Sequence, residues 1–110
     1  MGLFFWKNNK TIDTFANTAA NSLFSAMQPQ AVQAYMDNSM DDRQAKKFGK
    51  TMDRAIQDQV NKIKEFIRLH SLGVYGKARL HLKIRERLAE LGYSPDVVVK
   101  IDQMIMLKTP

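Results

Sequence analysis

One stretch decides the fold of this chain: residues 39–72, SMDDRQAKKFGKTMDRAIQDQVNKIKEFIRLHSL. Its apolar residues recur every three or four positions and fall on one arc of a helix, whereas the charged residues lie outside that arc. The members of the arc are Phe48, Met52, Ala55, Ile56, Val60, Ile63, Phe66 and Ile67. The stretch therefore predicts one long amphipathic helix with a single face against a core.

The sequence also predicts where this helix begins and ends. Ser39 is of the residue type preferred at an N-cap, and Asp42, three residues later, completes a capping box. Gly73 follows Leu72 at the position where a left-handed residue commonly ends a helix. Such a helix would be about 50 Å long, at about 1.5 Å per residue. We therefore expect its N-terminal third to project, or the helix to kink near Gly49.

Two polar residues, Gln59 and His70, interrupt the apolar arc. They could form a buried polar site. Alternatively, Gln59 hydrogen-bonds to a neighbouring helix and His70 caps the last turn, where a cation suits the helix dipole. The second interpretation is favoured.

Shorter helices are predicted on both sides of the long one. Residues 11–27 form a helix capped by Thr11, and small Ala residues on its apolar face permit a close approach to a neighbour. Pro29 begins a short helix over residues 29–37. After the long helix, Gly73 and Gly76 allow a sharp turn into a helix over residues 77–91.

The helix over residues 77–91 has two apolar flanks, which predicts that it is sandwiched between neighbours. The main ridge consists of Leu80, Ile84, Leu88 and Leu91, and the second flank of Ala78, Leu82 and Ala89. Gly92 ends this helix, and Ser94 and Pro95 then begin a last helix as its cap and first residue.

Length and composition bound the fold class. The chain has 110 residues, of which 45% are hydrophobic, which suits one domain with a real core. We expect an all-α bundle of four to five helices around one long central helix, which packs against the helices on either side of it in sequence. Residues 11–110 would form a single helical domain, preceded by an apolar and basic segment over residues 1–10. No segment approaches the ~20 apolar residues of a membrane span, and the absence of Cys is compatible with a cytoplasmic protein.

The net charge of +6 is concentrated in one region of the sequence. Between residues 62 and 87, eight basic residues face only two acidic ones, which leaves the whole excess of +6 there. Such a cluster attracts an anionic partner, either nucleic acid, an acidic protein or an anionic membrane surface. The candidate binding residues are Lys62, Lys64, Arg68, Lys77, Arg79, Lys83 and Arg87.

The same region has the outline of a helix-turn-helix, which would place some of these side chains on phosphates. Side chains that typically read bases are scarce on its second helix, however. A tight helical hairpin within a bundle explains the spacing without DNA, and this interpretation is favoured.

Two further surfaces are candidates for contact with a partner. The first begins the chain and pairs apolar residues with a basic one: Leu3, Phe4, Phe5, Trp6 and Lys7. It would either fold back on the bundle or lie in a membrane interface, where Trp beside Lys is common. The second lies on the last helix, where Val99, Met106 and Leu107 point away from its inner face and would be buried in a homodimer.

The sequence contains no pattern that indicates catalysis. It has two His, His70 and His81, and no Cys or H-E-x-x-H, so no metal site is expected. The glycines at 73 and 76, followed by Lys77, lack the spacing of a phosphate-binding loop. We therefore predict a non-enzymatic protein without a cofactor.

The C-terminal third carries a resemblance. The run Leu-Gly-Val-Tyr-Gly-Lys-Ala-Arg-Leu, residues 72–80, is followed by a helix and by Gly-Tyr-Ser-Pro-Asp, residues 92–96. This combination resembles a group of small bacterial helical proteins of uncharacterised function. The resemblance implies a small helical cytoplasmic protein and brings no activity or functional residue with it.

Overall fold

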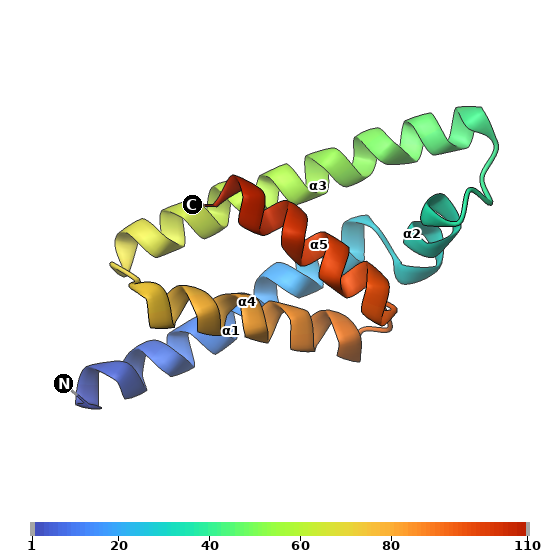
Figure 1. Ribbon diagram of the computed structural model, residues 1–110. Helices are drawn as coiled ribbons and strands as arrows, with labels where there is room; N and C mark the ends of the chain where they lie inside the picture. The colour runs from blue at the N-terminus through green and yellow to red at the C-terminus, as the bar shows by residue number, and fades with distance from the viewer. Residues whose placement is uncertain (1, 110) are drawn as a thin grey trace.

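The computed structural model describes the backbone of residues 2–109 and the side chains of residues 9–109. The described residues form five helices, which are labelled in Figure 1: α1 (Gly2–Ala26), α2 (Pro29–Met36), α3 (Asp42–Leu69), α4 (Val74–Glu90) and α5 (Pro95–Lys108). No strand occurs in residues 2–109. The predicted all-α class is confirmed.

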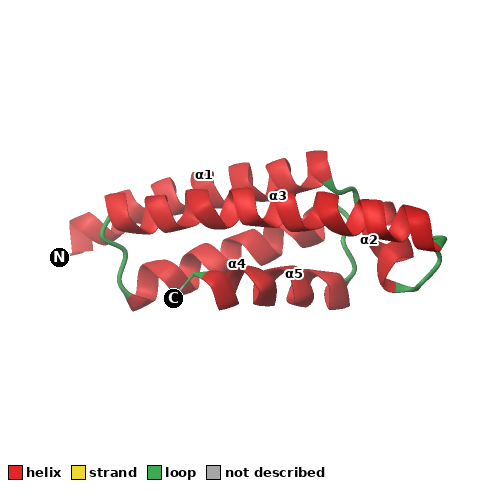
Figure 2. Cartoon of the chain, turned by 90° about the horizontal axis from the view of Figure 1, so that it is seen from above, coloured by secondary structure: helices red, strands yellow, loops and turns green. Residues whose placement is uncertain are grey.

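Four of the helices form an elongated bundle. α1 packs against α3 and α4, and α5 packs against the same two helices. In Figure 2, α1 and α3 form one layer, and α4 and α5 lie below them. α2 packs on α3 at the far end, and the longest dimension of the molecule is 53 Å.

The prediction of which helices neighbour α3 was only partly right. We expected α3 to pack against the helices on either side of it in sequence. α2 does pack on it, but its main partners are α1 and α5, and α4 packs most extensively on α1. The favoured tight hairpin of α3 and α4 is therefore wrong, although the chain does reverse between them (Figure 1). The reason is that small residues on α1, including Ala16 and Ala20, let α4 approach closely, and both are fully buried.

The predicted core faces are confirmed. Most of the apolar arc of α3 is buried, including Met52, Val60 and Ile63, and Gln59 is buried beside them. Phe48 and Ile67 are partly buried. On α4, the main ridge packs inward, but the second flank is exposed, with Leu82 44% accessible. α4 does lie between two neighbours, α1 and α5, as predicted, but the predicted second flank is not one of its buried sides.

The N-terminal third of α3 extends along α2 rather than projecting alone. The helix is continuous through Gly49. The ring of Tyr35 on α2 lies 5.7 Å from that of Phe48, and a Cβ at Gly49 would come within 3.0 Å of the Tyr35 hydroxyl oxygen. Gly49 is thus a site of close packing rather than a kink.

The start of α3 differs from the prediction. Asp41, not Ser39, is the N-cap, and its Oδ1 accepts a 2.8 Å hydrogen bond from the backbone N–H of Gln44. Ser39 instead closes the end of α2, where its N–H donates to the carbonyl of Ala34. This pattern is a Schellman motif in which Asn38, at φ 56°, takes the left-handed position.

The end of α3 is built in the same way. Ser71, at φ 48°, takes the left-handed position that the sequence assigned to Gly73, and the N–H of Leu72 donates to the carbonyl of Ile67. His70 is the C-cap residue, as predicted. Gly73 is instead the N-cap of α4, and α4 begins three residues earlier than expected. Gly76 is consequently helical, and a Cβ there would lie 3.1 Å from Leu72 Cδ2.

The remaining helix ends show two confirmed predictions and one wrong prediction. Ser94 caps α5 and accepts a hydrogen bond from the N–H of Val97, and Gly92, at φ 106°, ends α4 as predicted. In contrast, α1 begins at Gly2, so the predicted cap at Thr11 is wrong. Residues 2–10 contain no helix-ending Pro, and they continue α1.

Candidate functional site: the basic end of the bundle

The basic residues of α4 are largely paired with carboxylates. The pairs are Arg79 with Asp13 at 2.9 Å, Lys83 with Glu86 at 3.1 Å, Arg85 with Asp102 at 2.8 Å and Arg87 with Glu90 at 3.5 Å. Three of these carboxylates lie outside residues 62–87, so they reduce the excess of the cluster from +6 to +3. The charge that α4 offers to a partner is therefore smaller than its sequence indicates.

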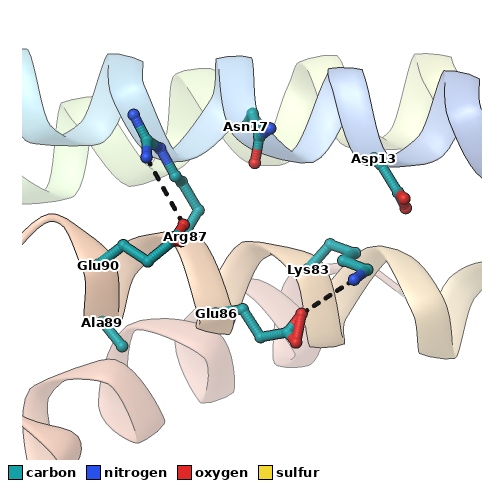
Figure 3. A pocket seen from close by; sticks show the side chains of 7 residues that line it. All are labelled: Asp13, Asn17, Lys83, Glu86, Arg87, Ala89 and Glu90. Carbon is teal, nitrogen blue, oxygen red and sulfur yellow. Dashed lines mark ion pairs between the residues drawn. The ribbon is translucent and has the colours of Figure 1, made fainter.

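The groove between α1 and α4 shows this neutralisation directly. Figure 3 shows Asp13 and Asn17 on α1 facing Lys83, Glu86, Arg87 and Glu90 on α4, with each basic side chain joined to a carboxylate. Arg87 also donates from Nε to Asn21 Oδ1 over 3.1 Å. Lys83 and Arg87 already have carboxylate partners here, so an anionic partner would have to compete with Glu86 and Glu90 for them.

A different part of the molecule holds the net charge. We define the basic end as residues 2–13 and 62–79, which the fold brings together at one end of the bundle (Figures 1 and 2). It contains seven basic residues and two acidic ones, Asp13 and Glu65, for a net charge of +5. The rest of the chain has ten basic and nine acidic residues, for a net charge of +1.

Within the basic end, the predicted binding residues are in different environments. Lys62 and Lys64 are exposed and make no ion pair with the part of the chain that the structure describes. Arg68 is also exposed but pairs with Glu65, and its hydrogen bond lowers the pKa of that carboxyl. Lys77 and Arg79 are half-buried at the start of α4. The lysines on α3 are thus the most available cations of the predicted set.

Apolar side chains are exposed at the same end. Leu69 is 63% accessible, Val74 88% and Tyr75 52%, and all three flank the turn between α3 and α4. The backbone of the first turns of α1 extends past this turn in both views (Figures 1 and 2). These turns contain Leu3, Phe4, Phe5, Trp6 and Lys7, whose side chains lie outside the described residues.

A stack of rings holds α1 to α3 behind this apolar tip. Phe15 of α1 lies parallel to Phe66 of α3, with ring centroids 4.0 Å apart. His70, at the end of α3, packs against the ring of Phe66, with the two ring centroids 4.4 Å apart. The stack therefore fixes the position of α1 relative to the turn between α3 and α4.

Sequence reasoning missed a buried polar cluster between α4 and α5. Nδ1 of His81 lies 2.7 Å from Oδ1 of Asp102, and Nη1 of Arg85 donates to Oδ2 over 2.8 Å. Asp102 is only 3% exposed. Burial raises its pKa, but the hydrogen bonds from His81 and Arg85 outweigh burial, so the pKa lies below the usual value of 3.8.

The missed cluster had a signal in the sequence. Asp102 lies four residues after Val98 and three before Ile105, on the inner face of α5, and His81 lies three residues before Ile84 on α4. A charged residue in such a position needs a buried partner. Asp102 supplies that link between the two helices.

The surface of α5 agrees with the prediction in part. Val99, Met106 and Leu107 are exposed, as expected. Their burial in a homodimer stays a prediction. None of the helices in the described part of the chain is long and apolar enough to cross a bilayer.

Comparison of the chain with protein-family models, with curated proteins and with solved structures gave no match. The resemblance to small bacterial helical proteins therefore stays a prediction.

Proposed function

We propose that this protein is a non-enzymatic interaction module that binds an anionic partner through the basic end of the bundle. The observation that carries the proposal is the gathering of a net +5 at one end of a molecule 53 Å long. The other residues are close to neutral as a set, so the molecule is polarised along its length.

This charge distribution favours the approach of an anionic partner to the basic end. At physiological salt, exposed charges more than about 8 Å apart are largely screened from one another. A partner at the basic end therefore meets the local excess there, and the carboxylates at the far end of α3, such as Asp41 and Asp42, do not offset it. Such a surface also steers an anionic partner toward this end during the encounter.

The availability of individual cations narrows the predicted surface. Lys62, Lys64 and Lys10 have no ion pair within the described residues, so a partner need not displace a carboxylate to reach them. Lys83 and Arg87, farther along α4, are held by Glu86 and Glu90. We expect the lysines to contribute more to binding than the paired residues of α4.

A pair of charge variants tests the proposal. The double substitution Lys62→Gln and Lys64→Gln should weaken binding to an anionic partner by about 10- to 30-fold at low salt, because each lysine near an anionic surface contributes about 1 kcal/mol. Binding is measured by fluorescence anisotropy with labelled duplex DNA of mixed sequence or polyglutamate, and by co-sedimentation with anionic vesicles. Each probe is tested at about 50 mM and about 200 mM salt.

The matched control is Lys46→Gln with Lys50→Gln, which removes the same charge from the exposed N-terminal half of α3. This variant should bind as the wild type does, within about twofold. The proposal is wrong if no probe binds, or if both double variants weaken binding equally.

A further inference from the structure

We infer that the anionic partner is a lipid bilayer surface, which the basic end meets with its exposed apolar residues inserted at the headgroup level. This inference rests on the proposed function and names the class of partner. It is motivated by the exposure of Leu69, Val74 and Tyr75 beside the available lysines.

The chemistry of these residues discriminates among anionic partners. Duplex DNA is met mainly through phosphates and base edges, and it offers little to bury aliphatic side chains such as Leu69 and Val74. A bilayer interface accepts both components, because its anionic headgroups attract lysine while the acyl boundary accepts apolar side chains. Tyrosine and tryptophan are enriched at this level of a membrane.

The spacing along α3 fits the depth of such an interface. Lys64 lies five residues before Leu69, and Lys62 lies seven before it. At about 1.5 Å per residue, the lysine backbones sit about 7–10 Å behind the apolar tip. An amphipathic segment buries its apolar face about 5–10 Å into the headgroup and acyl boundary. The lysines would therefore reach the phosphates when Leu69 reaches the acyl boundary.

The sequence at the start of α1 would add apolar residues at the same end. Its first turns carry Leu3, Phe4, Phe5 and Trp6 in sequence, and the helix extends past the turn between α3 and α4 (Figure 1). Four apolar residues are too few for stable anchoring alone, and stable membrane binding commonly takes two signals. Here one signal would be the apolar residues at this end of the bundle, and the other would be the lysines of α3 that lie behind them.

The inference is tested with the full chain and vesicles of mixed phosphatidylcholine and phosphatidylglycerol. The double substitution Leu69→Ser and Val74→Ser should lower the partition coefficient about tenfold or more in co-sedimentation, because it removes apolar surface that leaves water on binding. The matched control is Leu82→Ser with Val99→Ser, at positions exposed on α4 and α5 away from the tip. It should partition as the wild type does. All four positions are exposed, and circular dichroism and thermal unfolding verify that the variants fold.

The outcomes separate the inference from the proposed function. Loss of vesicle binding in Leu69→Ser/Val74→Ser, with the control unchanged and no binding of the wild type to pure phosphatidylcholine vesicles, supports the inference. Equal partitioning of that variant and the wild type overturns the inference, while the proposed function stands if Lys62→Gln/Lys64→Gln is weakened. Binding of the wild type to DNA or polyglutamate but not to the vesicles overturns it in favour of those partners. Absence of binding to every probe overturns both.

Discussion

Replacing Asp102 with Ala should lower the free energy of unfolding by about 3 kcal/mol. Asp102 is buried and holds both His81 and Arg85, so its removal leaves two polar side chains of α4 without their partner. Removing one member of a buried charged network typically costs about 3–5 kcal/mol. The lower part of that range is expected because Arg85 is 38% exposed and water can solvate it. Urea unfolding followed by circular dichroism measures the change.

The effect of this substitution should depend on pH. The pKa of Asp102 in the folded protein is lowered, so its ionised form stabilises the fold. This contribution is fully present above the pKa of the unfolded chain and is lost as the pH falls through the lower folded value. The difference between the wild type and Asp102→Ala should therefore shrink as the pH falls below 3.8, the usual pKa of an aspartate.

Asp58→Ala is the control for Asp102→Ala. Asp58 is exposed on α3, and its loss should change the free energy of unfolding by no more than about 0.5 kcal/mol. An equal and small effect of both substitutions would contradict the assigned role of Asp102 in joining α4 to α5. A penalty for Asp102→Ala that grows as the pH falls would contradict the sign of its pKa shift.

Replacing Phe66 with Ala should also destabilise the protein, by about 3–4 kcal/mol. Phe66 is buried and stacks on Phe15 of α1, with His70 against the same ring. Removing a buried Phe side chain typically costs about 3–5 kcal/mol, through lost apolar burial and the cavity left behind. Thermal and urea unfolding measure the loss.

The control for Phe66→Ala is Leu69→Ala, three residues later on α3. Leu69 is largely exposed, so this substitution should change stability by no more than about 0.5 kcal/mol. A loss of less than about 1 kcal/mol in Phe66→Ala would mean that the stack does not hold α1 in place at the basic end.

The amphipathic periodicity of the sequence was enough to predict the all-α class and most buried faces. Helix ends were harder, because the left-handed position after α3 is taken by Ser71 instead of the glycine two residues later. A glycine is the usual residue there, so the sequence pointed to Gly73. Because α3 ends earlier than predicted, α4 also begins earlier than predicted.

The neighbours of each helix could not be predicted. An apolar arc shows that a face is buried, but not which helix covers it. The ion pair of Arg79 with Asp13 spans 66 residues in sequence, and that of Arg85 with Asp102 spans 17. Because these contacts depend on the topology, counting charges along the sequence overstated the excess on α4. That residues 2–13 lie beside residues 62–79 could likewise be known only from the fold.

The most direct test of membrane binding uses the emission of Trp6, the only tryptophan, which belongs to the first turns of α1. Adding vesicles that contain phosphatidylglycerol at low salt should shift the emission to shorter wavelength, because binding places the first turns of α1 in the interface. High salt, or the double substitution Lys62→Gln and Lys64→Gln, should reduce the shift. An emission that stays unchanged while the protein co-sediments with the vesicles would contradict the account, since binding would then use another surface.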